Sequence, residues 1–254
     1  MIVDGRAIAK DILARTRVRS ERLAHPPRVL AIVISETPAT LSYLKIKGMR
    51  AADAGCVLEI ARFPLEVSAA ELRSAASSAD ADAIIVQLPL PIGIDTQDVC
   101  NAIPLSKDAD VLSSGAREQF KKAEAGALLP PVVGAVREIC TQNDINLKGM
   151  KGVVIGDGWL VGNPCAIWLK QQGTLVSVLT SQSGDIRGAL IDADIIVSGA
   201  GVSGLIKPEF LKSGVVLIDA ATSESNGIIT GDADPACASI ASLFTPVPGG
   251  IGPI

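Results

Sequence analysis

A tyrosine and a lysine four positions apart, Tyr43 and Lys47, are the residues of this sequence best suited to catalysis. Residues at this spacing lie on the same face of a helix. A partly desolvated lysine amine beside a tyrosine hydroxyl can transfer protons near neutral pH. From the spacing alone, an ordinary surface lysine beside a half-buried tyrosine is the simpler interpretation, because such pairs are common on helices.

A glycine-rich segment, Gly156-Asp157-Gly158-Trp159-Leu160-Val161-Gly162, directly follows an apolar run. Its G-x-G-x-x-x-G spacing is a variant of the dinucleotide-binding fingerprint. In that motif Gly156 allows the tight turn, Gly158 lets the backbone approach a pyrophosphate, and Gly162 lets the following helix pack closely. N–H groups at the helix start would face the phosphates. Glycine turns also serve ordinary strand–helix packing, so the motif alone leaves that interpretation open.

The other reactive residue types argue against metal or disulfide chemistry. The single histidine, His25, precedes Pro26-Pro27 and is expected on a surface loop. A histidine-based triad and a multi-histidine metal site are therefore excluded, and we expect no metal. The cysteines are odd in number and contain no CxxC pair, which disfavours a zinc site or a disulfide framework. They are Cys56, Cys100, Cys140, Cys165 and Cys237.

Composition narrows the class of protein further. The chain has 254 residues, of which 48% are hydrophobic but only 3% aromatic, so its core is built from Ala, Val, Ile and Leu. Such a core suits parallel sheets covered by helices. The net charge of −4 and the lack of a basic stripe disfavour a nucleic-acid partner. No apolar run of about 18 residues exists, so neither a signal peptide nor a membrane partner is expected.

Alternating helix and strand signals would position these residues. Asp4 can cap a helix over about residues 5–24, Pro38 opens a helix ending near Gly55, and Ser68-Ala-Ala-Glu71 is a capping box for a third. Proline residues in the LPLPIG segment end the third strand. The predicted strands of this half are Arg28–Ile34, Cys56–Arg62 and Ala83–Gln87.

A loop around Lys107–Gly115 and a break at Pro130-Pro131 indicate a second domain. Its predicted strands are Val153–Gly156, Thr174–Leu179, Asp194–Ser198 and Val215–Ala220. Strands that alternate with helices imply βαβ units and parallel pairing. The predicted fold class is α/β, with two α/β domains around a cleft, residues 1–125 and 126–254. The second is a Rossmann-like doubly wound parallel sheet, and ligands are expected at the carboxyl ends of its strands.

Five segments, in one order from residue 2 to the end, resemble the bifunctional methylenetetrahydrofolate dehydrogenase/cyclohydrolase family. Each segment alone is a weak match, but their common order makes chance agreement improbable. The segments are Tyr43-x-x-x-Lys47 with Ala51-Ala52-Asp53-Ala54-Gly55, the VQLPLP loop Val86–Pro91, the K-D-x-D loop Lys107–Asp110, the nucleotide loop Val153–Pro164, and Thr245–Pro253, similar to TPVPGGVGP.

The resemblance implies roles for these residues. Lys47 would transfer protons at the one-carbon centre of the folate, and Tyr43 would stack or hydrogen-bond near the pterin and p-aminobenzoate. Gln87 would orient Lys47 and the substrate. Asp110 would accept hydrogen bonds from the pterin amino group, a donor that a carboxylate accepts well. Pro248 and Gly249 would line the cleft, to which residues 245–254 return.

Structural alternatives exist for three of these positions. Gln87 could cap a strand end, Asp110 could form an Asx-turn, and Pro248-Gly249 could be a simple turn. Taken with the five matching segments, the functional interpretation is preferred for Lys47, Gln87 and Asp110.

The implied reactions are oxidation of 5,10-methylenetetrahydrofolate by NAD(P)⁺ and hydrolysis of the methenyl product to 10-formyltetrahydrofolate. Orientation of two bound ligands serves the first step and managed proton transfer serves the second. The methenyl cation is already an activated electrophile and requires no metal. The resemblance also implies a cytoplasmic homodimer whose partners are tetrahydrofolate one-carbon derivatives, with a place in purine biosynthesis.

Departures from the family pattern gather on the nucleotide side. The family commonly has Gly-Arg-Ser where this chain has Gly156-Asp157-Gly158, and Cys-Thr-Pro-x-Gly where it has Pro130–Gly134. Trp159 is bulky for a loop that approaches phosphates, and Thr180–Ser183 holds neither an acidic residue for a ribose nor an arginine for a 2′-phosphate. The predicted cofactor is NAD or NADP, with NAD favoured by Asp157 and binding expected to be weak.

Two alternatives to a bifunctional enzyme follow from these departures. The first is a cyclohydrolase with weak or lost dehydrogenase activity, suggested by Asp157, Trp159 and Pro131. The second is a non-catalytic folate-binding homologue. Retention of both Tyr43 and Lys47 argues against the second, because binding alone does not need that pair.

Overall fold

The computed structural model describes residues 1–34, 38–78, 80–225 and 228–254. It divides into two compact units, one formed by Asp11–Leu129 and the other by Met1–Lys10 together with Pro130–Ile254. The predicted division into 1–125 and 126–254 therefore differs at the N-terminus. Main-chain bonds explain the difference, because Val3 N donates to Phe244 O and Gly5 N donates to Gly249 O, both at 2.9 Å.

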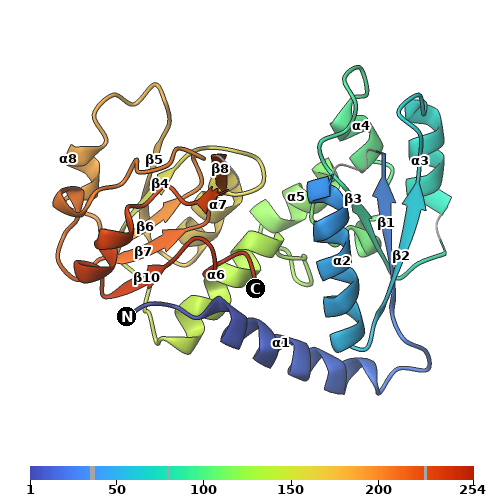
Figure 1. Ribbon diagram of the computed structural model, residues 1–254, viewed down its shortest axis with the longest axis horizontal. Coiled ribbons are helices and arrows are strands. Elements are labelled where there is room, and N and C mark those ends of the chain that lie inside the picture. Colours follow the sequence, from blue (N-terminus) through green and yellow to red (C-terminus); the bar gives the residue numbers. More distant parts are fainter. Residues whose placement is uncertain (35–37, 79, 226–227) are drawn as a thin grey trace. The chain divides into compact units, whose positions relative to one another are not determined.

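The first unit, Asp11–Leu129, has a three-stranded parallel sheet in the order β2-β1-β3. Helices α2 (Pro38–Asp53) and α3 (Ala69–Ser78) flank this sheet (Figure 1). The central strand supplies the fully buried Ile32 and Val33, as expected for a strand covered on both faces. The strands are β1 (Arg28–Val33), β2 (Val57–Arg62) and β3 (Ala83–Val86).

Local capping explains where the helices of this half begin. Asp4 Oδ1 accepts from the backbone N–H groups of Arg6 and Ala7 at 3.0 and 3.1 Å, which confirms Asp4 as the cap of α1 (Gly5–Ser20). This helix ends four residues before the predicted end. The capping box before α3 is also confirmed, since Ser68 N donates to Glu71 Oε2 at 2.9 Å and Glu71 N donates to Ser68 Oγ at 3.3 Å.

A chain of short elements follows β3 and completes this unit. They are the helices α4 (Thr96–Cys100) and α5 (Ser114–Lys121), with the 3₁₀ turn η1 (Leu105–Lys107) between them. Asp108, just after η1, bridges Ile84 of β3 in a parallel sense. The bridge places the Lys107–Asp110 loop beside the edge strand.

The second unit has a five-stranded parallel sheet in the order β10-β7-β6-β4-β5. Neighbouring strands β4 and β6 have connections that run in opposite directions, which makes the edge between them the topological switch point of a Rossmann-like fold. The predicted α/β class with parallel sheets is confirmed. The strands are β4 (Lys151–Ile155), β5 (Leu175–Leu179), β6 (Ile195–Ser198), β7 (Val216–Asp219) and β10 (Leu243–Thr245).

Helices and short turns complete the second unit. Helix α7 packs against β4 and β5 and contacts α6. Three short strands escaped the sequence analysis: β10, and the antiparallel pair β8 (Ser223–Ser225) and β9 (Ile228–Thr230). The other elements are α6 (Pro131–Gln142), α7 (Gly162–Gln171), α8 (Arg187–Leu190), η2 (Pro208–Phe210) and η3 (Pro235–Ser239).

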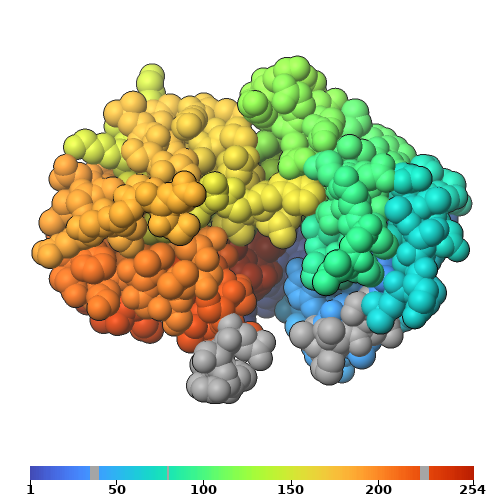
Figure 2. Space-filling model, turned by 90° about the horizontal axis from the view of Figure 1, so that it is seen from above, coloured from blue at the N-terminus to red at the C-terminus, as the bar shows by residue number. Residues whose placement is uncertain are grey.

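Helix α3 lies at the surface of its unit. Figure 2 shows the cyan segment around α3 at the surface, and this helix buries only Leu72 and Ala76 against its unit. Within the described ranges, no helix is both long and apolar enough to cross a membrane.

Candidate active site

Helix α2 presents the predicted tyrosine–lysine pair on one face. Lys47 Nζ lies 4.7 Å from the centroid of the Tyr43 ring, a cation–π contact produced by the i,i+4 spacing. Lys47 is half-buried, whereas 50% of the Tyr43 surface is exposed. The aromatic ring therefore covers one side of the amine and leaves part of its own surface open to a ligand.

Asp110 stands on a loop that its neighbour Asp108 holds in place. The Asp108 carboxylate is fully buried and accepts from Leu112 N at 3.0 Å and from Ser113 N at 2.7 Å. Val111, between them, has the unusual φ of +56°. The local turn role that the sequence allowed for Asp110 is thus filled by Asp108, and the half-buried Asp110 carboxylate has no such bond among the described residues.

Tyr43, Lys47 and Asp110, here called the Lys47 cluster, interact electrostatically. Burial lowers the pKa of Lys47, and the charge of Asp110 opposes that shift. Burial also raises the pKa of Asp110, opposed by Lys47 and reinforced by Asp108. Partial burial and Asp110 together raise the pKa of Tyr43. The cluster thus combines an amine that releases its proton more easily than usual with a carboxylate that holds one more tightly.

Gln87 follows β3 at the carboxyl edge of the same sheet. Its backbone N donates to Ile32 O at 2.9 Å, and its side-chain Nε2 donates to Leu88 O at 3.3 Å. Among the described residues no hydrogen bond joins Gln87 to Lys47, so its role in orienting Lys47 stays a prediction. Gln87 extends the ladder by one bond beyond the last strand residue, as the structural alternative had allowed.

The glycine turn of the second unit has the geometry that its spacing predicts. Gly156 has φ +91°, and a Cβ there would lie 2.9 Å from Gly199 O. A Cβ on Gly162 would lie 1.9 Å from Gly156 O, so the start of α7 packs directly on the turn. A Cβ on Gly158 would meet nothing within 4 Å. Tight packing below the turn and open space at Gly158 fit the approach of a dinucleotide pyrophosphate.

Two side chains in this turn, Asp157 and Trp159, differ in exposure. Asp157 is exposed, so its charge is available at the surface of the turn, and Trp159 is half-buried. Beyond the end of β5, Thr180 N donates to Ser183 Oγ at 2.9 Å and Gln182 N donates to Thr180 Oγ1 at 3.3 Å. These hydroxyls close a turn of their own.

A cluster of buried polar residues lies at the carboxyl ends of β6, β7 and β10. The sequence analysis did not identify these residues as candidates for function. We call Ser198, Asp219, Asp232 and Thr245 the Asp232 cluster; all four are at most 1% exposed. Asp219 N donates to Thr245 Oγ1 at 2.7 Å, and Asp219 Oδ2 accepts from Ala233 N at 2.8 Å. The available signal was the position of two of these residues, Ser198 and Asp219, at the ends of predicted strands.

Burial raises the pKa of Asp219 to about 6. Backbone donors from Ala233, Ala221 and Asp232 oppose that shift, while the nearby charge of Asp232 adds to it. A carboxyl group with this pKa titrates close to neutral pH, which is rare for an aspartate.

Pro248 and Gly249 belong to the second unit, in the turn that follows β10. Gly249 has φ +111°, and Gly250 N donates to Pro246 O at 2.7 Å. The turn packs on the N-terminal segment, since a Cβ on Gly5 would lie 1.8 Å from Gly250 O. Lining of a folate site by Pro248 and Gly249 stays a prediction.

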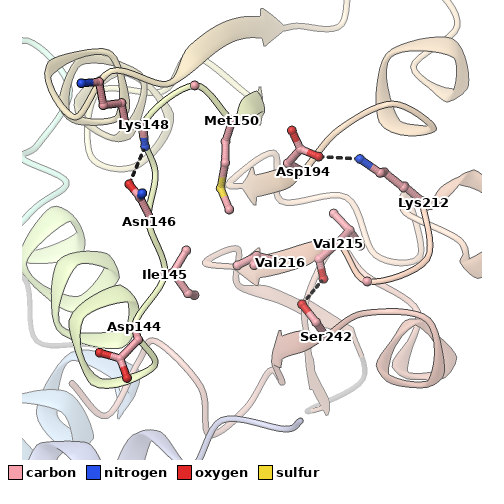
Figure 3. A pocket seen from close by; sticks show the side chains of 12 residues that line it. Asp144, Ile145, Asn146, Lys148, Met150, Asp194, Lys212, Val215, Val216 and Ser242 are labelled. Atoms are coloured by element: carbon pink, nitrogen blue, oxygen red, sulfur yellow. Dashed lines mark hydrogen bonds and ion pairs between the residues drawn. The ribbon is translucent and has the colours of Figure 1, made fainter.

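Two surface hollows lie away from these residues. One, of about 570 Å³, is lined by residues at the amino ends of β4, β6 and β7, with Met150 toward its centre and the Lys212–Asp194 ion pair on its rim (Figure 3). Another, of about 580 Å³, surrounds Arg28 and Glu59 at the amino ends of β1 and β2. Ligands of open α/β sheets bind at the carboxyl ends, so neither hollow is the candidate site.

A metal site is not formed by the described ranges, which contain no group of three or more His, Cys, Asp or Glu side chains placed to hold an ion.

Comparison with known proteins assigns a known type of domain to each half of the chain. Residues 3–110 match the family "Tetrahydrofolate dehydrogenase/cyclohydrolase, catalytic domain", and residues 130–254 match its "NAD(P)-binding domain". The "Bifunctional protein FolD" of Cupriavidus pinatubonensis is 34% identical over 269 aligned positions, which cover 100% of this chain and 92% of that protein.

Solved structures show the same relationship. The bifunctional FolD of Campylobacter jejuni superposes with a TM-score of 0.94 at 27% identity, covering 100% of this chain and 93% of that one. The Trypanosoma brucei enzyme, solved with NADP and an inhibitor, superposes with a TM-score of 0.92 at 29% identity, covering 100% and 92%. Full-length similarity in both sequence and fold, with both domain types in order, shows that this chain belongs to the tetrahydrofolate dehydrogenase/cyclohydrolase family.

Proposed function

We propose that this chain oxidises 5,10-methylenetetrahydrofolate with NAD(P)⁺ and hydrolyses the methenyl product to 10-formyltetrahydrofolate, with Lys47 as its proton-transfer residue. The observation that carries the proposal is the Lys47 amine, half-buried against the Tyr43 ring and coupled to the charge of Asp110. These residues all fall within the part of the chain that matches the family's catalytic domain.

For the hydrolytic step, Lys47 is the group that handles protons. Water adds to the methenyl carbon and loses a proton, which the neutral amine of Lys47 accepts. The carbon–N5 bond then breaks as the added hydroxyl loses its proton to solvent and becomes the formyl oxygen on N10, and Lys47 returns a proton to N5. A lowered pKa increases the neutral fraction of the amine and so favours the first of these transfers.

Asp110, Gln87 and Tyr43 bind and orient the folate in this proposal. Asp110 has no competing hydrogen bond among the described residues, so its carboxylate is available to the pterin amino group. The half-exposed Tyr43 ring offers a stacking surface. The hydrogen bond from the Gln87 side-chain amide to Leu88 O is long, at 3.3 Å, so a substrate can replace it.

The nucleotide would be held by the turn and helix start at Gly156, Asp157, Gly158, Trp159 and Gly162, and bound NAD(P)⁺ supplies the hydride acceptor for the oxidation. Gly156 and Gly162 keep the turn compact, and Gly158 leaves space for the pyrophosphate. The chain's contribution to this step is therefore orientation of two ligands rather than acid–base chemistry.

The preferred nucleotide is NAD in this proposal. A 2′-phosphate near the exposed Asp157 would meet a like charge, and the hydroxyls of Thr180 and Ser183 are used within their own turn. Arg187, the arginine that follows this turn in sequence, lies over the Phe210 ring with its guanidinium carbon 6.0 Å from the centroid. The Trypanosoma brucei neighbour was solved with NADP, whereas the preference proposed here rests on Asp157 and on the turn Thr180–Ser183 of this chain.

Titration of NAD and NADP against the purified protein, with methylenetetrahydrofolate turnover followed in parallel, tests these proposals together. We expect turnover with NAD at least about tenfold more efficient than with NADP, and Asp157→Arg to reduce that ratio. Asp192→Arg is the matched control, because it makes the same charge change before β6 at the amino edge of the sheet. Stronger NADP use by the unmodified protein would overturn the charge argument.

If the protein binds neither nucleotide but still hydrolyses methenyltetrahydrofolate, it is a cyclohydrolase without dehydrogenase activity. The half-buried Trp159 in the nucleotide turn is the observation that favours this second candidate. We also propose the family's setting for this chain, a cytoplasmic homodimer that supplies formyl groups for purine biosynthesis; sedimentation of the purified protein tests the dimer.

A further inference from the structure

Asp232 is a fully buried carboxylate that organises a loop distant from it in sequence. Its Oδ2 accepts from Ser198 Oγ at 2.5 Å and from Ala200 N at 2.8 Å, while its Oδ1 accepts from Val202 N at 2.6 Å. These three hydrogen bonds satisfy both oxygens of the buried carboxyl group. All three donors belong to the end of β6 and the loop Gly199–Val202 that follows it.

That loop packs on the turn assigned to the nucleotide. Gly199 N donates to Ile155 O at 2.9 Å, and a Cβ on Gly199 would lie 2.4 Å from Val161 Cγ1. On the other side of this contact, a Cβ on Gly156 would lie 2.9 Å from Gly199 O. The glycine turn after β4 and the loop after β6 therefore form one closely packed surface at the topological switch point.

The order of the strands indicates which half of a dinucleotide each loop would face. In doubly wound folds the dinucleotide crosses the switch point, and the adenosine ribose lies near the end of the second strand of the first βαβ unit. Here that strand is β5, next to β4. The loops after β6 and β7 are on the opposite side of β4, where the nicotinamide half would lie.

We propose that Asp232 is a positioning residue for the nicotinamide half of the bound dinucleotide, acting by holding the backbone of Gly199–Val202 in its binding conformation. This inference rests on the nucleotide binding proposed above. Asp232 itself has no exposed surface, so it acts only through the loop. The neighbouring Asp219 serves the same region by accepting from Ala233 N and Ala221 N, which fixes the segment that carries Asp232.

Replacement of Asp232 by asparagine tests the proposal. An amide keeps the size of the side chain but has one acceptor oxygen, so in either orientation at least one of the Ala200 and Val202 N–H groups loses its partner. We expect Asp232→Asn to bind NAD about tenfold more weakly by calorimetry while ADP, which lacks the nicotinamide half, binds within twofold of the unmodified protein. Amide exchange at Ala200 and Val202 should accelerate.

Asp234→Asn is the matched control, because its exposed carboxylate caps η3 by accepting from Ala236 N at 2.8 Å and does not bond to the loop. It should change neither affinity. If Asp232→Asn does not fold, Ser198→Ala, which removes one donor and keeps both backbone bonds, should weaken NAD about threefold with ADP unaffected.

Equal weakening of NAD and ADP in these variants would show a general structural role and overturn the proposal, as would unchanged NAD affinity. Failure of the unmodified protein to bind NAD or NADP would instead overturn the dehydrogenase half of the proposed function, and this inference with it.

Discussion

Charged side chains at the carboxyl edges of the two sheets differ in how far their hydrogen-bonding capacity is used. In the Lys47 cluster, Lys47 and Asp110 interact through their charges but have no hydrogen bond or ion pair among the described residues. In the Asp232 cluster, the Asp219 and Asp232 carboxylates accept five hydrogen bonds from backbone N–H groups and one hydroxyl. The difference indicates that the first cluster is available to a substrate and the second shapes the protein.

The same contrast exists within the Lys107–Asp110 loop of the first unit. Asp108 is fully buried and bonded to two backbone N–H groups, whereas Asp110 is half-buried and lacks such bonds. One carboxylate of this loop supports the backbone, and the other is proposed to bind the folate, so mutations should separate the two functions.

The largest effect is expected for Lys47. Lys47→Ala should reduce hydrolysis of methenyltetrahydrofolate by about 10²–10⁴-fold, because loss of a positioned proton-transfer group has effects of this order. Absorbance of the methenyl compound measures the rate, and circular dichroism checks the fold. Lys45→Ala is the control, because Lys45 is an exposed lysine on the same helix. Near-normal hydrolysis by Lys47→Ala would remove the basis of the comparison.

Asp219 should make the stability of the protein depend on pH in an unusual direction. Its folded pKa, about 6, lies above the ordinary value of 3.8, so the folded state holds the proton more tightly than the unfolded state. Its contribution to the free energy of unfolding is therefore greatest below pH 3.8 and falls as the pH rises through 6.

Asp219→Asn should lose this dependence. Relative to the unmodified protein, the variant should gain about 2–3 kcal/mol in free energy of unfolding between about pH 4 and pH 7, as expected for a shift of roughly two pKa units. Denaturant titrations across that range measure the difference. A difference between the two proteins that is constant with pH would contradict the assigned pKa.

Asp110→Ala should weaken folate binding by about 1.5–3 kcal/mol, because the pterin amino group loses a charged acceptor. Stability should not fall, since the variant removes a partly buried carboxyl group that has no hydrogen bond to lose among the described residues. Calorimetry with a folate and with NAD separates the two ligands. Unchanged folate affinity with weakened NAD binding would show that Asp110 serves the nucleotide rather than the folate.

Asp108→Asn sharpens the contrast with Asp110. The amide can satisfy only one of the Leu112 and Ser113 N–H groups, which should cost about 1–3 kcal/mol in free energy of unfolding. A larger loss of stability from Asp110→Ala than from Asp108→Asn would reverse the roles given to these residues.

Short-range patterns predicted much of this molecule. The Ser68–Glu71 capping box, the cap at Asp4 and the turn at Gly156 are each formed by residues close together in the chain, so local preferences specify them. The parallel strands were recognisable for the same reason, although their ends moved by one or two residues. Strand β10 was missed because it has only three residues, Leu243–Thr245, followed by proline.

Long-range packing decided the remainder. The N-terminal residues join the second unit through Phe244, a partner about 240 residues away, and no local pattern encodes that contact. Likewise, the family resemblance marked Asp110, and the departure from the family pattern in the glycine-rich segment marked Asp157, as charged site residues. Only the fold showed that Asp108 and Asp232 accept the backbone hydrogen bonds that hold the neighbouring loops. Whether a carboxylate binds a ligand or supports a loop depends on which N–H groups surround it, and those groups are brought together only by folding.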